Sequence, residues 1–232
     1  MRLRRIHMAA KKKNNRMLYG VIGLGRFGSA LAKAIAEAGE DILVIDKDQA
    51  KVTAAGEYTD NAYLVGELTR ENLEAVGVGN CDVAVVAIGE KLDTSLLTTM
   101  NLLKLGVKRV ISKAQTSDHG ALLELMGAEV VYPEHDMAVR LAGKLLAPHI
   151  IEYISLSSEI DIMEIKLTKK TAGKSVLELN VRGNFGLNII AVKHEGVITT
   201  DIYPTTVFDA DDTITVIGSR NAVRRFEDFI RE

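Results

Sequence analysis

A glycine-rich turn near the start of the chain carries the clearest chemical signal. Gly23, Gly25 and Gly28 form a G-x-G-x-x-G pattern between an apolar run and a helical one. In such turns the first glycine permits a tight bend, the second lets a pyrophosphate approach the backbone, and the third allows close helix packing. The N–H groups at the start of the helix would then bind phosphate. The turn predicts a site for a nucleotide.

Three charged residues have the types and positions that such a site needs. Asp46 ends the second apolar run, 23 residues after Gly23, where a carboxylate can accept hydrogen bonds from ribose hydroxyls. Arg26, inside the turn, is either a guanidinium for phosphate oxygens of the same or a neighbouring subunit, or a solvated surface arginine. Glu134, after the last predicted strand of the sheet, is either a ligand for a divalent or alkali cation at the phosphates, or a cap for the next helix.

The chain lacks the residues that hydride transfer would need besides a nucleotide. Its five histidines are scattered, with no spacing typical of a catalytic or metal-binding pair. It contains no Tyr-x-x-x-Lys, no nucleophile elbow and no C-x-x-C motif. An NAD-dependent oxidoreductase stays an alternative, as does an NADH-sensing transcription regulator, although no helix-turn-helix signal is present. We expect a nucleotide-binding protein that is not an enzyme.

Alternating strands and helices must position this site. Continuous apolar runs between helices are typical of parallel strands that are covered on both faces. The predicted strands span residues 18–22, 41–45, 62–65, 83–88, 110–112 and 129–132. The predicted helices span residues 27–38, 49–57, 70–76, 94–105, 119–126 and 136–146. The fold class is therefore α/β, with a Rossmann-like, doubly wound parallel sheet.

A smaller domain follows this sheet. After Pro148 the predicted strands become short, at residues 160–166, 188–192, 197–200 and 212–217, and a helix at 221–230 ends the chain. This pattern predicts a small α+β domain. We expect a basic, disordered tail at residues 1–16, a nucleotide-binding domain with a crossover helix at 17–149, and a ligand-binding domain at 150–232.

Composition and charge exclude several classes of protein. The 232 residues are 47% hydrophobic and 26% charged, which is typical of a folded globular chain. No apolar run is long enough to span a membrane, and no signal peptide is recognisable, so a cytoplasmic protein is expected. Residues 1–16 hold seven of the 29 basic residues and no acidic one, so the rest has a net charge of −9. The basic tail could contact nucleic acid or an anionic membrane, but it lacks aromatic residues for base stacking.

Several segments together resemble the RCK (TrkA-N) domains of bacterial potassium-uptake regulators. They are residues 21–28, 45–46, 85–89, 113–115 and 133–138, and residues 173–193 are similar to the accompanying TrkA-C module. The resemblance covers nearly all of the chain after Met17 and is closest to the Ktr type, which has one module of each kind. It implies a cytosolic gating subunit at the inner face of the membrane. Homodimers would assemble into an octameric ring beneath a membrane-embedded potassium channel subunit (KtrB/TrkH-like), with no nucleic acid as partner.

The resemblance also implies ligands and site residues. The family binds ATP and ADP, and in some members NAD or NADH, with Mg or Ca at the phosphates. The implied nucleotide-binding residues are Gly23, Gly25, Arg26, Phe27, Gly28, Asp46, Lys47, Asp48, Gly66, Glu67, Ile88, Gly89, Glu90, Lys113, His119 and Glu134. Glu134 matches the family's metal ligand. Glu67 stands where many relatives have Asp or Asn, so the adenine contact is open.

The TrkA-C module resembles modules that bind cyclic di-AMP between two subunits and thereby close the channel. The matching residues are Val176, Leu177, Asn180, Val181, Arg182, Asn188, Ile189, Ile190 and Pro204. An arginine for phosphates, an asparagine for adenine edges and aliphatic side chains for base faces would suit this ligand. Alternatively, the aliphatic members are core residues.

Overall fold

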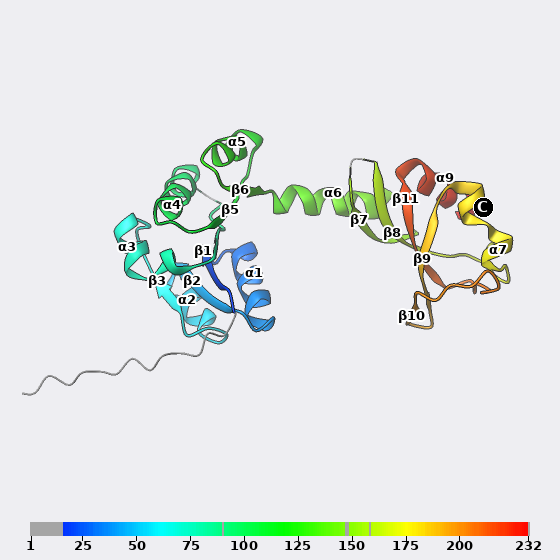
Figure 1. The fold of residues 1–232 in the computed structure, drawn as a ribbon, viewed down its shortest axis with the longest axis horizontal. Coiled ribbons are helices and arrows are strands. Elements are labelled where there is room, and N and C mark those ends of the chain that lie inside the picture. Colours follow the sequence, from blue (N-terminus) through cyan, green and yellow to red (C-terminus); the bar gives the residue numbers. More distant parts are fainter. Residues whose placement is uncertain (1–15, 90, 147–148, 158, 232) are drawn as a thin grey trace, which may run out of the picture. The chain divides into compact units, whose positions relative to one another are not determined.

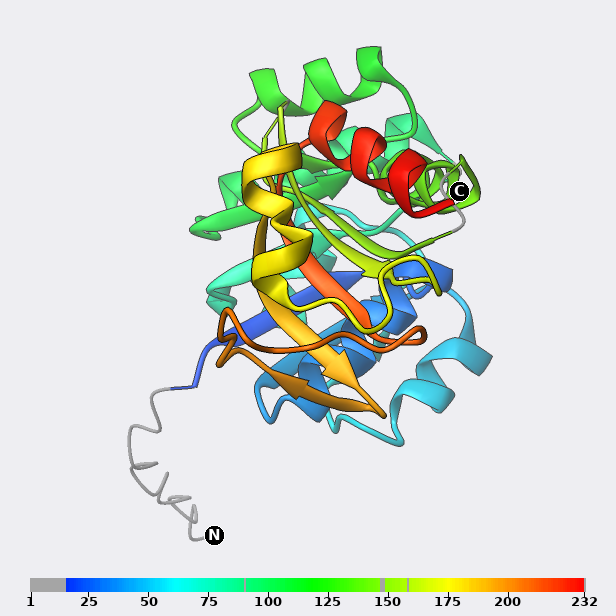
Figure 2. The same cartoon turned by 90° about the vertical axis from the view of Figure 1, so that its right-hand side faces the viewer.

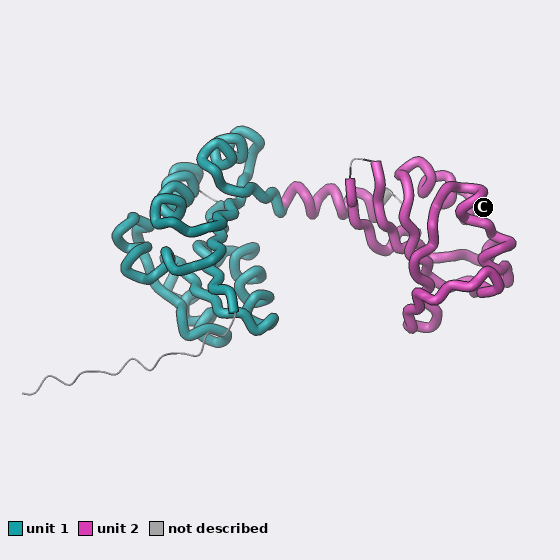
Figure 3. The backbone as a smooth tube through the Cα atoms, in the orientation of Figure 1, with its two compact units in different colours: residues 1–133 teal, residues 134–232 magenta. Residues whose placement is uncertain are grey.

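The chain forms two compact units, residues 1–133 and residues 134–232, each described here by itself (Figure 3). The structure is a computed structural model, and it describes residues 16–89, 91–146, 149–157 and 159–231. Glu90 and nearly all of the basic tail lie outside these residues. The division assigns the helix that follows residue 132 to the second unit, whereas the sequence analysis assigns it to the first domain. The domain boundaries at residues 16 and 149 stay a prediction.

The first unit is a parallel sheet with helices on both faces (Figure 1). Its strands are β1 (Leu18–Ile22), β2 (Asp41–Asp46), β3 (Ala62–Leu64), β4 (Val83–Val86), β5 (Arg109–Lys113) and β6 (Glu129–Val131). Its helices are α1 (Arg26–Glu37), α2 (Gln49–Ala55), α3 (Arg70–Ala75), the 3₁₀ turn η1 (Val78–Asn80), α4 (Leu92–Lys104) and α5 (Ser117–Leu125). The strand order is β3-β2-β1-β4-β5-β6, and every pairing is parallel. The predicted fold class is confirmed.

Side chains that alternate along the strands build a separate core on each face of this sheet. Val21 and Val44 pack with Ala32 of α1 on one face. Ile22 and its neighbours pack with Leu73 of α3 and Leu102 of α4 on the other face. Because both faces are buried, the central strands are apolar throughout, which is the pattern that the sequence analysis used.

The second unit begins with helix α6 (Pro133–Leu146) and contains an antiparallel sheet. Its strands are β7 (Ile150–Ser155), β8 (Ile160–Lys166), β9 (Asn188–His194), β10 (Val197–Thr199) and β11 (Thr213–Ser219), in the order β10-β9-β11-β8-β7. Its other helices are α7 (Val176–Leu179), α8 (Val181–Phe185) and α9 (Arg220–Arg231). Figure 2 shows α7, α8 and α9 on the same face of the sheet. None of the described helices combines the length and apolar character needed to cross a membrane.

Two details of the second unit differ from the sequence-based expectation. Helix α6 begins at Pro133 rather than Asp136, because proline lacks the N–H that the first turn leaves unpaired and has a φ suited to it. Helices α7 and α8 were not predicted, since each is too short to show an apolar repeat. They meet at Asn180, whose φ of 41° lies in the left-handed region, and its side chain accepts a hydrogen bond from Gly183 N at 3.1 Å.

Candidate functional site

A cavity of about 710 Å³ opens at the carboxyl edge of the parallel sheet. The chain passes from β1 to β2 on one side and from β3 to β4 on the other, so the strand order reverses between β1 and β4. The cavity is lined by Ile22 at the end of β1 and Gly23 after it, and by Ala87, Ile88 and Gly89 after β4. Ligands of open α/β sheets bind at this kind of reversal. The position of the cavity therefore follows from the topology.

The glycine turn has the geometry that phosphate binding requires. Gly23 has a φ of +97°, which glycine adopts easily, and a Cβ at Gly28 would overlap the carbonyl oxygen of Gly23. At Gly25, in contrast, an added Cβ would meet nothing within 4 Å. Gly25 is also the N-cap of α1, with no side-chain cap and no acidic residue in the first turn. The N–H groups of this helix end are therefore left for an anion.

Asp46 joins the second strand to the glycine turn. One carboxylate oxygen accepts a hydrogen bond from Leu24 N at 2.5 Å, and the other accepts one from Asp48 N at 2.9 Å. Lys51 Nζ lies 3.8 Å from the same carboxylate, whose residue is only 7% exposed. Each oxygen keeps a lone pair for a further donor, such as a ribose hydroxyl. Asp46 thus both shapes the turn and lines the cavity.

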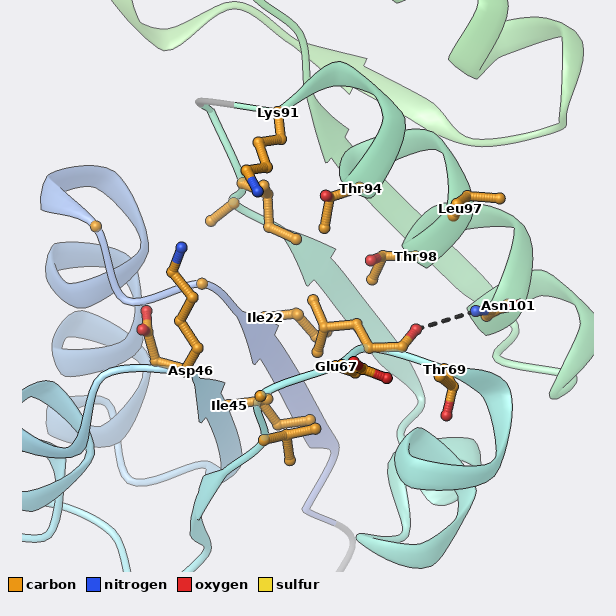
Figure 4. Close-up of a pocket in the computed structure, with 18 of the residues that line it drawn as sticks. Ile22, Ile45, Asp46, Glu67, Thr69, Lys91, Thr94, Leu97, Thr98 and Asn101 are labelled. Carbon is orange, nitrogen blue, oxygen red and sulfur yellow. Dashed lines mark hydrogen bonds between the residues drawn. The ribbon is translucent and has the colours of Figure 1, made fainter.

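The far wall of the cavity is built from the β3–α3 loop and helix α4. Asn101 Nδ2 of α4 donates a hydrogen bond to the Leu68 carbonyl at 3.1 Å, and Asn72 Nδ2 donates one to the Glu67 carbonyl at 2.9 Å. Figure 4 shows Thr94 and Thr98 on α4 above this loop, with Asn101 bonded to it. These two amides fix the position of the loop that carries Gly66 and Glu67.

The structure brings about half of the predicted nucleotide-binding residues together. Those that line the cavity are Gly23, Gly25, Asp46, Lys47, Gly66, Glu67, Ile88 and Gly89. Arg26 is exposed and Phe27 packs against the core, and neither lines the cavity. Gly28 lets α1 pack close to the Gly23 carbonyl, and Asp48 is the N-cap of α2. Glu90 lies outside the described residues, and Glu134 belongs to the second unit.

Two further predicted residues lie near the carboxyl edge but outside the cavity lining. Lys113 is buried, and its Nζ would lie 3.4 Å from a Cβ built at Gly89. His119 is 3% exposed on α5, and its Nε2 has no hydrogen-bond partner among the described residues. Burial lowers the pKa of His119 and so disfavours the charged form of the ring.

Sequence reasoning missed several residues that line the cavity. They include Lys51, Arg70, Lys91, Thr94, Thr98 and Asn101. A signal existed for part of this set, because residues 94, 98 and 101 are polar and lie at a helical spacing on one side of α4. No spacing rule would have found Lys51, since its place depends on how α2 leaves the second strand.

The residues predicted to bind cyclic di-AMP divide between surface and core. Leu177 is 70% exposed and Ile190 is 39% exposed, whereas Val181 is buried in the core. Val176 and Ile189 are half-buried against that core. Arg182, Asn188 and Pro204 are exposed, and so is Asn180. Leu177 N donates a hydrogen bond to the Pro204 carbonyl at 3.0 Å, which joins α7 to the loop that precedes β11. For Val181 the core interpretation holds.

Comparisons with known proteins cover both units. The TrkA-N domain model matches residues 19–133, and the TrkA-C domain model matches residues 162–231. The chain is 37% identical to Ktr system potassium uptake protein C of Bacillus subtilis over 90% of this chain and 95% of that protein. It is 35% identical to Ktr system potassium uptake protein A of the same organism, with the same coverage of both chains.

A solved structure supports the fold. The GsuK channel bound to NAD has a TM-score of 0.61 and is 20% identical. The match covers 95% of this chain but only 40% of that channel chain.

Proposed function

We propose a function for this chain on one premise: it belongs to the Ktr family of potassium-uptake proteins, which combine a TrkA-N domain with a TrkA-C domain. The chain is a regulatory subunit of a potassium transport system and not an enzyme. Its partner is a membrane-embedded potassium channel subunit, at whose cytoplasmic side it acts. Homodimers assemble into an octameric ring, and the occupant of the nucleotide cavity sets the shape of this ring.

The observation that carries the proposal is the cavity at the strand-order reversal. It combines an uncapped helix N-terminus with the Asp46 carboxylate and an apolar interior that includes Ile22 and Ile45. A nucleotide needs these three environments for its phosphates, ribose and base. The rim contains both basic and acidic side chains, among them Lys51, Arg70 and Glu71. ATP, ADP, NAD and NADH all have the required parts, so these are the candidate ligands.

Ligand exchange would regulate transport through a difference in affinity. A ligand shifts the equilibrium between two ring shapes only if it binds one of them more tightly. Arg26 is exposed at the first turn of α1, and its guanidinium is suited to a terminal phosphate of the same or a neighbouring subunit. Contact with a third phosphate would let the ring distinguish ATP from ADP.

Two further ligands belong to the proposal. Glu134 would hold Mg or Ca near the phosphates, because hard cations take carboxylate and phosphate oxygens together. Cyclic di-AMP would bind the second unit, where the exposed side chains of Leu177 and Ile190 offer apolar surface and Arg182 offers a cation. The family resemblance suggests both ligands. The exposure of Leu177, Ile190 and Arg182 is compatible with the binding of cyclic di-AMP.

Calorimetry on the purified full-length chain tests the proposal. ATP, ADP, NADH and cyclic di-AMP are titrated with and without Mg²⁺, and potassium uptake is measured in cells that carry a channel subunit but lack its regulator. Nucleotide binding in the micromolar range together with restored uptake would support a regulatory subunit. Failure of all nucleotides to bind below millimolar concentration would refute it.

An Arg26→Ala variant tests the sensing step separately. If Arg26 contacts the terminal phosphate, the substitution weakens ATP binding much more than ADP binding, so the ratio of the two affinities falls. Equal losses for both nucleotides would contradict this role.

A further inference from the structure

A second group of polar side chains lies far along the chain from the nucleotide cavity, at the end of β9 and the start of β11. The Nδ1 atom of His194 lies 2.7 Å from Asp212 Oδ1 and 3.5 Å from Asp209 Oδ2. One ligand atom from each residue lies within 4.8 Å of the other two. The same residues line a hollow of about 440 Å³ in the second unit.

The separations suit ligands that share one ion. Nitrogen and oxygen ligands bind Zn²⁺ or a similar ion at about 2.0–2.2 Å, which sets neighbouring ligand atoms of a tetrahedral site roughly 3.3–3.6 Å apart. The distance from His194 to Asp209 lies within this range, and the distance from His194 to Asp212 is shorter. His194 and Asp209 both have exposed side chains, so small rotations would bring the three atoms into place. The hollow leaves room for water to complete the coordination.

The charges around the group call for a cation. Asp212 is 3% exposed, and its two oxygens accept hydrogen bonds from the His194 ring and from Asp209 N at 2.8 Å. A buried carboxylate with a second carboxylate nearby is costly unless positive charge offsets it.

The two lysines that lie opposite Thr213 on the neighbouring strands have other partners. Lys193 Nζ lies 3.9 Å from Glu164, and Lys166 Nζ lies 3.0 Å from Asp211. Glu195 adds a further negative charge beside His194. Within the described residues, Asp212 forms its ion pair with an imidazole, which is not a permanent cation.

We propose that His194, Asp209 and Asp212 form a binding site for a divalent transition-metal ion of the Zn²⁺ and Co²⁺ class. Imidazole nitrogen favours such ions over Mg²⁺ and Ca²⁺, which prefer sites made of oxygen alone. The site is independent of the proposed nucleotide function, because it lies on residues that the nucleotide cavity does not use.

The bound ion would fasten both ends of the connection between β9 and β11. His194 precedes this connection and Asp212 ends it, while its middle is hydrogen-bonded to α7 through Pro204 and Thr206. Metal binding would hold this connection to the sheet and so stiffen the surface beside Leu177.

Titration of the full-length protein with Co²⁺ in buffer that contains excess Mg²⁺ tests the site. Calorimetry gives the affinity, and the visible absorption of Co²⁺ reports nitrogen and oxygen ligands. We expect one tight equivalent, weakened roughly tenfold or more by His194→Ala and by Asp209→Asn. The second substitution is isosteric at an exposed position, so it decides the outcome if the first variant misfolds.

His135→Ala is the matched control. His135 is also an exposed histidine beside an aspartate, with Nδ1 3.2 Å from Asp136 Oδ1, and it should leave Co²⁺ binding unchanged. Binding that is lost in this variant but kept in Asp209→Asn would place the ion on α6 and overturn the proposal. Absence of saturable binding below millimolar Co²⁺ would overturn it as well. Neither result depends on whether nucleotides bind.

Discussion

At the scale of single residues, the three glycines of the turn serve different purposes. Gly28 is needed for packing, because a Cβ would overlap the Gly23 carbonyl oxygen, whereas Gly25 faces open space. Gly25 also has a φ of −70°, which alanine adopts without strain. Gly25 is the N-cap of α1, where glycine is favoured over alanine, and the approach of a ligand gives a second reason for the absence of a side chain. The same motif combines one structural glycine with one functional glycine.

Alanine substitutions separate these two purposes. Gly28→Ala should lower the free energy of unfolding by about 1–3 kcal/mol, as overpacking does elsewhere. Gly25→Ala replaces the N-cap of α1, so it should lower the free energy of unfolding by only about 0.5–1 kcal/mol but weaken ATP or ADP binding roughly tenfold. Urea denaturation and calorimetry on both variants provide the comparison. Equal stability of the two variants would contradict the assignment.

Asp46 offers a second residue-scale prediction. Asp46→Asn keeps the shape but replaces one acceptor oxygen with a donor, so one of the hydrogen bonds from Leu24 N and Asp48 N is lost. A ribose hydroxyl would also lose its charged acceptor, and because a hydrogen bond to a charged group corresponds to about 1.5–3 kcal/mol, nucleotide affinity should fall roughly tenfold to a hundredfold. Calorimetry measures the change.

Asp41→Asn is the control for this substitution. Asp41 is exposed at the other end of the same strand, so its substitution should leave affinity unchanged. A similar loss in both variants would indicate a general charge effect rather than a contact at the site.

At the scale of elements, the loop between β3 and α3 depends on α4 for its position. Asn101→Ala removes the donor to the Leu68 carbonyl, which should cost about 1 kcal/mol and weaken nucleotide binding roughly fivefold. Lys104→Ala changes an exposed residue of the same helix and serves as the control. If both variants bind nucleotide like the unchanged chain, the loop does not need this hydrogen bond.

Helix α6 is held to strand β7 by a group of charges that predicts a pH dependence. Glu152 accepts hydrogen bonds from Arg140 and, at 2.8 Å, from Lys144, and these lower its pKa to about 2. Because the folded-state pKa is depressed, the stabilisation is fully present above the unfolded value of 4.5. It is lost as the pH falls from there through about 2.

As the pH falls from 4.5 to about 2, the Glu152→Gln variant should therefore lose less stability than the unchanged chain. Thermal unfolding at a series of pH values, compared with the unchanged chain, measures this effect. Glu159→Gln changes an exposed glutamate after β7 and should keep the original pH profile. Identical profiles for Glu152→Gln and the unchanged chain would exclude the role of Glu152.

At the scale of the whole molecule, each unit has a hydrophobic core of its own. The second unit packs around residues such as Phe208 and Phe226, and the first unit has a core on each face of its sheet. Calorimetric unfolding should therefore show two transitions. A ligand at 100 times its Kd stabilises its unit by about 2.7 kcal/mol, which corresponds to a shift of roughly 10 °C.

The ligands should act on different transitions. ATP should raise one midpoint, and cyclic di-AMP or Co²⁺ should raise the other. A single transition that all ligands raise together would show that the units unfold as one, and it would contradict the independence of the cores.

The sequence alone determined the order of strands and helices, the parallel sheet and the glycine turn with Asp46. These follow from local rules: apolar periodicity, the conformational freedom of glycine and the position of an acid at a strand end. The short helices α7 and α8 escaped prediction, because a helix of one turn has no repeat to detect. The start of α6 was placed late, because Pro133 permits a first helical turn after it ends a strand.

Only the tertiary structure decided which side chains share a cavity and which are core. Thr94, Thr98 and Asn101 enter the site because α4 packs against β4 and α3, and Val181 is core because α8 packs against α9 and β9. The group of His194, Asp209 and Asp212 exists only because β9 and β11 are neighbours in the antiparallel sheet. Such proximities depend on chain segments far apart in sequence, and no local spacing encodes them.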